Sequence, residues 1–153
     1  MHLVEIINFQ SQFAPRFYEL NVEWLKAYFY VEPYDEKILS NPQKYILDTG
    51  GFIFFAMHGK EVVGTVALID QKDFYELSKM AVAPAYRGSK IGQQLMNHCI
   101  SFAKAQHWKS ITLYSHRSLV AAINLYKKVG FVEIELESDS HYERSDIKMR
   151  LDL

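Results

Sequence analysis

The feature that most restricts the fold of this chain is a run of three strand-like segments followed by a helix and a further strand. Residues 52–57, 62–69 and 74–82 are apolar runs separated by short polar or glycine-containing turns, a pattern typical of antiparallel strands. Residues 91–105 then repeat apolar side chains at helical spacing, and residues 110–114 form the next strand. A strand, a helix and a strand in this order imply a right-handed crossover and a parallel pair.

Shorter elements flank this central run. They are a strand at 4–7, helices at 15–28, 35–39 and 119–129, and strands at 131–136 and 147–151. The sum is an α+β layer structure with about seven mostly antiparallel strands, four helices and one parallel βαβ step. Because no repeat, linker or shift of composition divides the chain, residues 1–153 are expected to form a single domain.

The charge balance excludes several classes of partner. The chain has 17 Lys and Arg against 18 Asp and Glu, a formal net charge of -1, so it has no basic footprint for nucleic acid or for an anionic membrane. Its single cysteine cannot form an intrachain disulfide, and its six histidines do not have the spacing of metal ligands, so no metal is expected. No apolar run approaches the ~20 residues of a membrane helix. We therefore expect a soluble cytoplasmic protein.

The most informative segment is the turn that opens the helix at 91–105. It reads Arg87-Gly88-Ser89-Lys90-Ile91-Gly92 and follows a strand and a proline. A helix start offers unpaired backbone N–H groups, and glycine lets an anion come close to the backbone. Arg87 and Lys90 add positive charge, so the turn suits a pyrophosphate, although a plain capped turn explains the same residues. The segment is neither a Walker A loop nor a GxGxxG motif.

This turn resembles the acetyl-CoA loop of the GNAT superfamily of N-acetyltransferases, whose pattern is Gln/Arg-x-x-Gly-x-Gly/Ala. Arg87 matches the first position and Gly92 the last, whereas Lys90 replaces the central glycine. Residues 122–131 resemble the second signature of the family, A-x-x-L-Y-x-K-x-G-F, and residues 142–149 are similar to its closing strand. The order of elements is similar from end to end, which identifies the chain as a bacterial, single-domain member.

The resemblance implies direct attack of a primary amine, of a small molecule, on acetyl-CoA. It implies Tyr126 as the acid beside the CoA sulfur and Glu76 as the base, directly or through water. The alternatives are a packed aromatic for Tyr126, and for Glu76 either a solvent-facing strand charge or a partner for Lys79. Strand alternation places Glu76, Ser78, Met80 and Val82 on one face. The family leaves a gap beside this strand for pantetheine, which implies backbone donors to the oxyanion at 80–82. The implied cofactor contacts are Met80, Ala81, Val82, Arg87, Gly88, Ser89, Lys90, Ile91, Gly92, Gln93, Asn124 and Lys127.

The acceptor site in this family comes from the first two helices and their loop. Here that region offers an aromatic and acidic rim made of Tyr28, Phe29, Tyr30 and Tyr34 with Glu32, Asp35 and Glu36. The rim favours a small cationic amine, such as a polyamine or an amino-acid derivative. Two other hypotheses remain, a non-catalytic acyl-CoA-binding sensor on the same fold and an unrelated nucleotide-binding α/β protein. The apolar closing strand at 147–151 would permit a homodimer.

Overall fold

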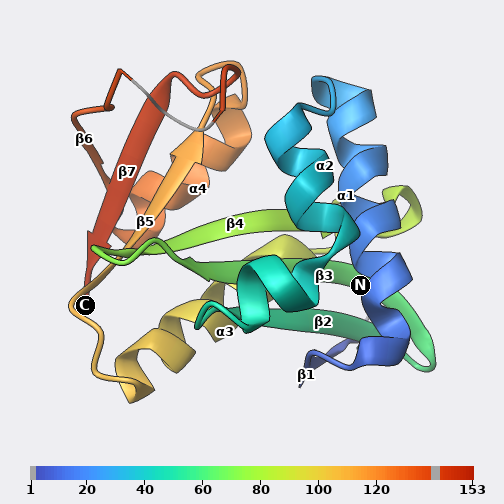
Figure 1. Ribbon diagram of the computed structural model, residues 1–153. Helices are drawn as coiled ribbons and strands as arrows, with labels where there is room; N and C mark the ends of the chain where they lie inside the picture. The colour runs from blue at the N-terminus through green and yellow to red at the C-terminus, as the bar shows by residue number, and fades with distance from the viewer. Residues whose placement is uncertain (1–2, 139–141) are drawn as a thin grey trace.

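The computed structural model describes residues 3–138 and 142–153, and these form a seven-stranded sheet with helices on both faces (Figure 1). The strand order is β1-β2-β3-β4-β5-β7-β6. Every neighbouring pair is antiparallel except β4 and β5, which are parallel. The predicted α+β sheet with one parallel βαβ step is therefore confirmed. The strands are β1 (Glu5–Asn8), β2 (Phe52–His58), β3 (Glu61–Asp70), β4 (Tyr75–Val82), β5 (Ser110–Ser115), β6 (Val132–Ile134) and β7 (Ile147–Asp152).

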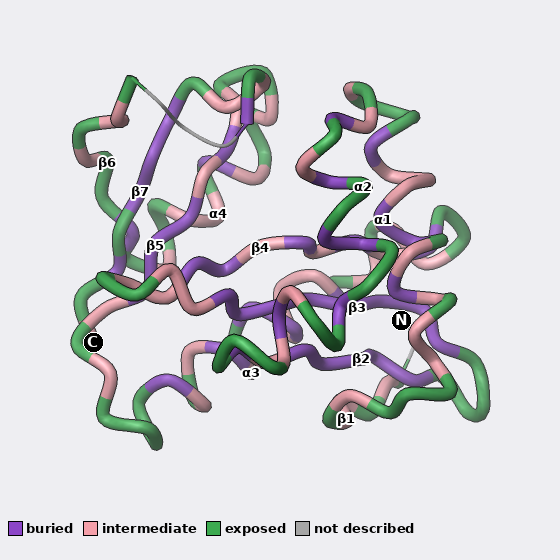
Figure 2. The backbone as a smooth tube through the Cα atoms, viewed as in Figure 1, coloured by how far each residue is buried: buried purple, intermediate pink, exposed green. Residues whose placement is uncertain are grey.

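Four longer helices cover the sheet. They are α1 (Ala14–Tyr28), α2 (Pro33–Ser40), α3 (Ile91–Ala105) and α4 (Val120–Val129). Side chains from α3 and α4 pack in one apolar core with β5 and β7, whereas α1 and α2 pack in a second core on the opposite face. Figure 2 shows the buried backbone concentrated in the central strands between these layers. Among the residues described, none of the helices has both the length and the apolar character needed to cross a bilayer.

The second helix begins two residues earlier than its apolar pattern predicts, because its own side chains cap it. Glu32 and Asp35 form a capping box. The Glu32 side chain accepts a hydrogen bond from the Asp35 backbone N–H, and the Asp35 side chain accepts one from the Glu32 backbone N–H. The Asp35 carboxylate lies 3.0 Å from the Glu32 backbone nitrogen. After this helix, a π-helical turn at Gln43–Leu47 leads into β2. The apolar pattern of the sequence does not predict this turn.

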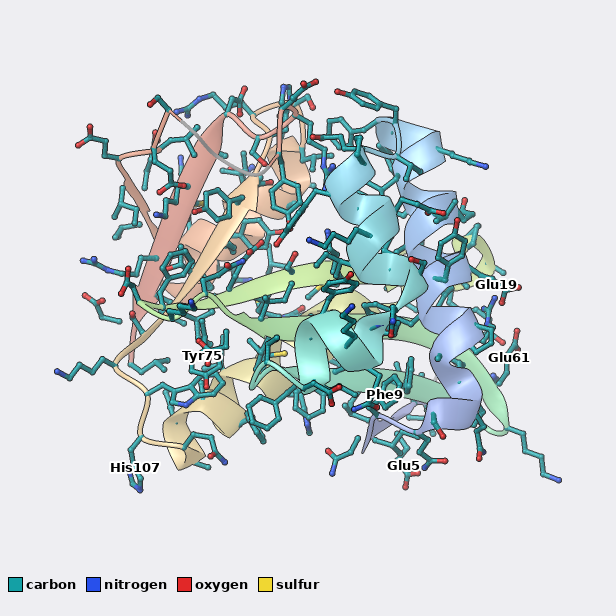
Figure 3. All side chains as sticks on the ribbon, viewed as in Figure 1. Glu5, Phe9, Glu19, Glu61, Tyr75 and His107 are labelled. Carbon is teal, nitrogen blue, oxygen red and sulfur yellow. The ribbon has the colours of Figure 1, made fainter. Side chains whose placement is uncertain are left out.

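The two halves of the sheet diverge between β4 and β5. These strands pair at one position, where Glu76 lies opposite Thr112. At the narrow end the Tyr75 ring stacks on Trp108 with centroids 3.6 Å apart, which holds the starts of the strands together (Figure 3). Beyond this point β5 and β7 turn away from β2, β3 and β4 (Figure 1). The sheet is therefore open along one edge of β4.

A bulge interrupts β4 inside this open stretch. Thr65 pairs with Ala81 and Ala67 pairs with Ser78, so residues 79 and 80 both lie opposite residue 66. Lys79 adopts a positive φ of 55°, a conformation that costs a side-chain-bearing residue of the order of 1 kcal/mol. The surrounding contacts must offset this cost.

The bulge changes which side chains share a face of β4. Met80 and Val82 pack against the core that contains Leu77, on the side of α3 and α4. Glu76 and Ser78 instead contact Tyr142 on the other side. The predicted alternation that placed Met80 and Val82 on the face of Glu76 is therefore wrong, because one inserted residue reverses the direction of every later side chain.

Candidate functional site

The divergence of the strands opens into a cavity of about 850 Å³. Its walls come from α1, the β4 stretch at 76–82, the start of α3, the end of β5, α4 and the segment 142–145. This volume is within the range of cavities that bind small molecules and cofactors. Because β4 pairs with β3 on one side but has no paired strand on its β5 side beyond Glu76, the backbone polar groups on that open side border the cavity. They are placed to bond to an extended ligand.

The turn before α3 forms one end of the cavity. Gly88 has a φ of 84°, and Lys90 immediately precedes the helix in the left-handed conformation. The first N–H groups of any α-helix have no acceptor within the helix, and among the described residues no side chain caps the start of α3. The positive end of the helix dipole is therefore exposed. A Cβ placed on Gly88 would meet nothing within 4 Å. The turn is therefore an open cradle whose chemistry fits a diphosphate.

Lys90 has a left-handed backbone conformation. Its φ of 64° and ψ of 19° lie in the left-handed region that glycine enters at little cost. Lys90 therefore adopts a conformation that glycine would also adopt readily. It adds a cation to the rim of the cradle, since Lys90 is exposed and lines the cavity.

Arg87 connects the turn to α1. Its Nε donates to the Val82 carbonyl oxygen at 3.0 Å, and its Nη2 lies 2.5 Å from the Glu23 carboxylate. The guanidinium carbon also lies 5.7 Å from the centre of the Tyr28 ring. Arg87 is therefore held beside the cradle by both the strand and the helix.

The structure brings most of the predicted cofactor residues to this one cavity. Those that line it are Met80, Ala81, Val82, Arg87, Gly88, Lys90, Ile91, Gly92 and Gln93. Ser89 is half-buried outside the lining, and Asn124 and Lys127 are exposed on α4, also outside it. The backbone of β4 and the turn thus share one surface, whereas the two polar residues of α4 are separate from it.

Glu76 lies in the cavity wall at the position where β4 and β5 pair. It is 1% exposed, so it is not a solvent-facing strand charge. One carboxylate oxygen accepts a hydrogen bond from Gln71 Nε2 at 2.8 Å, and the other accepts one from the Tyr142 hydroxyl at 3.4 Å. The carboxylate is therefore oriented from two sides where it borders the cavity.

Tyr126 reaches the cavity from α4, on the other side of the open strand edge. Its ring packs edge-on against Phe131 with centroids 5.9 Å apart. Burial raises the pKa of the phenol above its usual value of 10.0. The hydroxyl therefore stays protonated at neutral pH, which is the form that a proton donor needs.

A buried ion cluster forms the wall between α2, β4 and the segment before β7. We call it the Asp35 cluster, and it comprises Asp35, Lys79, Arg144 and Glu32. The Asp35 carboxylate is fully buried and lies 2.9 Å from Lys79 Nζ, 2.7 Å from Arg144 Nη1 and 3.1 Å from Arg144 Nη2. Arg144 Nη1 also donates to Glu32 at 2.8 Å. Segments distant in sequence are thus joined through one carboxylate.

The electrostatics of the cluster favour the ionised form of Asp35. Burial alone would raise the pKa of Asp35, but the hydrogen bonds from Arg144 and the charge of Lys79 outweigh burial and lower the pKa below 3.8. Burial lowers the pKa of Lys79, and the neighbouring Asp35 opposes this change. The Tyr142 hydroxyl lies 3.2 Å from Lys79 Nζ and so connects the cluster to Glu76.

The predicted acceptor residues divide into two groups. Tyr28 and Phe29 line the cavity. Tyr30 donates to Glu143 at 2.6 Å, and Tyr34 packs edge-on against Tyr142 at 5.4 Å, both outside the lining.

The predicted acidic rim is not free to bind a cation. Glu32 and Asp35 are bound by Arg144, and Glu36 accepts the Tyr18 hydroxyl at 2.8 Å outside the cavity. The sequence shows Glu32 and Asp35 but not their shared partner, because Arg144 lies about 110 positions away along the chain.

Several residues that line the cavity are not among the site residues predicted from the sequence. They are Trp24, Lys79, His116, Tyr142 and Arg144. Tyr142 and Arg144 lie in the tail that resembles the closing strand of the family, which was the available signal. The sequence contains no signal for Lys79, because no pattern in a single sequence indicates a bulge that turns a strand lysine inward.

Comparison with known proteins gives a consistent result. Residues 14–131 match the model of a family described as the acetyltransferase (GNAT) family. An uncharacterized N-acetyltransferase of Methanocaldococcus jannaschii is 32% identical over 96 residues, which is 58% of this chain and 42% of that protein. The chain spans less than half the length of the first curated relatives that it matches.

Solved structures extend the similarity to the whole fold. A GNAT family acetyltransferase from Staphylococcus aureus has a TM-score of 0.85 and 25% identity, covering 98% of this chain and 99% of its own. A GNAT family acetyltransferase from Elizabethkingia anophelis, solved with acetyl-CoA bound, has a TM-score of 0.75 and 22% identity, covering 98% of both chains.

Proposed function

Because this chain belongs to the acetyltransferase (GNAT) family, we propose that it transfers the acetyl group of acetyl-CoA to a primary amine of a small molecule. The observation that supports this most is the open edge of β4, which joins the cradle at α3 to Glu76 and Tyr126 within one cavity. Acetyl-CoA is the cofactor of the family, and it is bound in the E. anophelis protein, whose fold this chain shares.

The residues that would hold acetyl-CoA follow the length of the cavity. The backbone N–H groups of 88–92, with Arg87 and Lys90, would bind the diphosphate. The backbone of Met80 to Val82 would bond to the pantetheine amides as a neighbouring strand would. Asn124 and Lys127 on α4 are proposed contacts to the pantetheine or the ribose phosphate. When bound, the cofactor supplies an acetyl thioester that an amine can attack.

The side chains around the cavity supply the proton transfers. Glu76 would take a proton from the ammonium form of the acceptor, directly or through water, because the amine must be neutral to attack. Backbone N–H groups at 80–82 would donate to the thioester oxygen as negative charge develops there. Tyr126 would donate its phenolic proton to the departing sulfur. The nitrogen–carbon bond forms as the carbon–sulfur bond breaks, and the free thiol is released. The nitrogen then loses its second proton to give the amide, and a proton returned through solvent restores the Tyr126 hydroxyl.

Thiol release in the presence of an amine tests this proposal. We expect the wild-type chain to release thiol from acetyl-CoA only when an acceptor amine is present. Glu76→Gln should reduce the rate about 10²-fold at neutral pH, because a general base is lost. The deficit should shrink as the pH rises, since more of the amine is then unprotonated in solution.

A matched control is Glu5→Gln, which removes an exposed carboxylate from the edge strand β1 (Figure 3). The control should keep the wild-type rate. An equal rate for Glu76→Gln and wild type across the pH range would contradict the role of Glu76 as the base.

A further inference from the structure

We propose that Lys79 is a positioning residue for the acetyl transfer, which acts through the Tyr142 hydroxyl to hold the Glu76 carboxylate ionised and oriented in the cavity wall. This inference rests on the proposed function, in which Glu76 takes the proton of the acceptor. It gives a role to a lysine that the strand pattern of β4 does not predict to point inward. The basis is the set of contacts that this side chain makes.

The bulge in β4 places the Lys79 ammonium inside the protein. The residue lines the cavity but is only 8% exposed, and its Nζ donates to Asp35 at 2.9 Å and to the Tyr142 hydroxyl at 3.2 Å. Its backbone has a φ of 55°, which is unfavourable for a residue that carries a side chain. Strain of this kind persists where the surrounding structure fixes it, and it is concentrated at active sites.

The hydrogen bonds from Lys79 to Glu76 run in one direction. The Tyr142 hydroxyl accepts from Lys79 Nζ at 3.2 Å and donates to a Glu76 carboxylate oxygen at 3.4 Å. Burial above all, together with the charge of Glu76, raises the pKa of Tyr142 well above 10.0, so the hydroxyl keeps the proton that it donates. Hydrogen bonds in a chain polarise one another, so the ammonium strengthens the bond from Tyr142 to the carboxylate.

The charges of Lys79 and Glu76 also act on each other. Burial lowers the pKa of Lys79, and the charges of Asp35 and Glu76 oppose this change. Such coupling is reciprocal, so an ammonium that is favoured by a neighbouring carboxylate favours the ionised form of that carboxylate in return. Lys79 therefore extends the range in which Glu76 is able to take a proton toward lower pH.

Further groups contact Glu76 or act on its partners Lys79 and Tyr142. They are Tyr34 and Asp35 of α2, Gln71 of the turn before β4, Ser78 of β4, Thr112 and Tyr114 of β5, and Arg144 of the segment before β7. Asp35 and Arg144 carry charge and are paired with each other at 2.7 Å. All of these groups stay in place in the variants below, so a difference in pH dependence is due to the substituted side chain.

The test is the ratio of kcat/KM for Lys79→Met to that of the wild type, measured by thiol release at about pH 5 and about pH 8. The acceptor amine is the same in both reactions, so its own ionisation cancels in the ratio. Circular dichroism at each pH gives the folded fraction, to which the rates are normalised. We expect a ratio about tenfold lower at the acidic pH, because a carboxylate that loses a nearby cation takes up a proton at higher pH. A ratio that is equal at both pH values would overturn the inference, since a merely structural defect lowers both rates alike.

Two matched variants control for charge and for place. Lys79→Arg keeps a cation in the cavity wall and should show no acidic loss. Lys37→Met removes an exposed cation of α2 outside the cavity lining and should also show none. Equal acidic losses in Lys79→Met and Lys79→Arg would overturn the inference, because these two variants differ in charge.

Tyr142→Phe tests the connection itself, including the case in which Lys79→Met does not fold. It keeps the ring and removes the hydroxyl that lies between Lys79 and Glu76. We expect a loss in the same direction, larger at the acidic pH than at the alkaline one. The same ratio at both pH values in Tyr142→Phe would contradict the role of the hydroxyl and overturn the inference.

A double variant separates failure of this inference from failure of the proposed function. In the Glu76→Gln background, adding Lys79→Met should leave the pH dependence of the rate unchanged, because the carboxylate on which Lys79 acts is absent. An acidic loss that persists in this background would overturn the inference and leave the acetyl transfer standing. If no amine elicits thiol release from the wild type, the transfer itself is refuted, and this inference with it.

Discussion

Replacing Tyr126 with Phe should lower kcat by about 10²–10⁴-fold, the loss expected when a general acid is removed. The ring would keep its edge-on contact with Phe131, so the cavity wall should not change shape. The missing hydroxyl would leave the departing sulfur without a proton donor. Steady-state thiol release measures kcat, and calorimetric titration with acetyl-CoA should give a dissociation constant equal to that of the wild type.

Tyr75→Phe is the matched control for this change. Tyr75 stacks on Trp108 at the closed end of the strands, outside the cavity lining (Figure 3). It should retain wild-type kcat. If Tyr126→Phe also retains kcat, Tyr126 is a packing residue. If the wild type binds acetyl-CoA but no amine elicits thiol release, the chain is a non-catalytic acyl-CoA-binding module.

Replacing Asp35 with Ala should destabilise the protein by about 3–5 kcal/mol, because removing one partner of a buried ion pair leaves uncompensated charge. Lys79 and Arg144 would lose the carboxylate that joins them, and α2 would lose its capping box. Equilibrium denaturation by urea at neutral pH measures the change in the free energy of unfolding. Glu36→Ala, at the adjacent exposed position, should change it by only about 0.5 kcal/mol.

The contribution of Asp35 to the free energy of unfolding should decrease at low pH. Its pKa in the folded state lies below 3.8, so the folded state stabilises the ionised form. The contribution is complete above the unfolded-state pKa and is lost as the pH falls through the folded-state pKa. The difference in stability between wild type and Asp35→Ala should therefore shrink on acidification below about pH 4. A difference that grows on acidification would contradict the buried ion pair.

The order of elements is predictable from sequence because it depends on local periodicity. The pattern at 91–105 predicts α3 with its bounds as observed, and the apolar runs of β2, β3 and β4 differ from the strands by one or two residues. The turn at Arg87 is also local, since a glycine and a helix start suffice to shape it. The residues of the second signature place Tyr126 on α4.

The sequence-based predictions that are wrong concern features that depend on contacts between distant segments. The bulge at Lys79 is held by Asp35 and Tyr142, which lie 44 and 63 positions away in the chain. The periodicity of β4 does not indicate these partners. The predicted alternation of side-chain directions along β4 is therefore wrong from residue 79 onward. Arg144 is also far away in sequence from Glu32 and Asp35, so the sequence does not show that Arg144 neutralises these carboxylates.

The central claim is that the turn at Arg87 and Lys90 binds the diphosphate of acetyl-CoA, and thermal unfolding with added ligand tests it most directly. Acetyl-CoA at about a hundred times its dissociation constant should add roughly 2.7 kcal/mol and raise Tm by roughly 5–10 °C, whereas ATP and NAD should not. Lys90→Glu, which reverses a charge at the cradle, should remove most of this shift. Lys104→Glu, at the far end of the same helix, should keep it. An absent shift in the wild type, or a full shift in Lys90→Glu, would contradict the account.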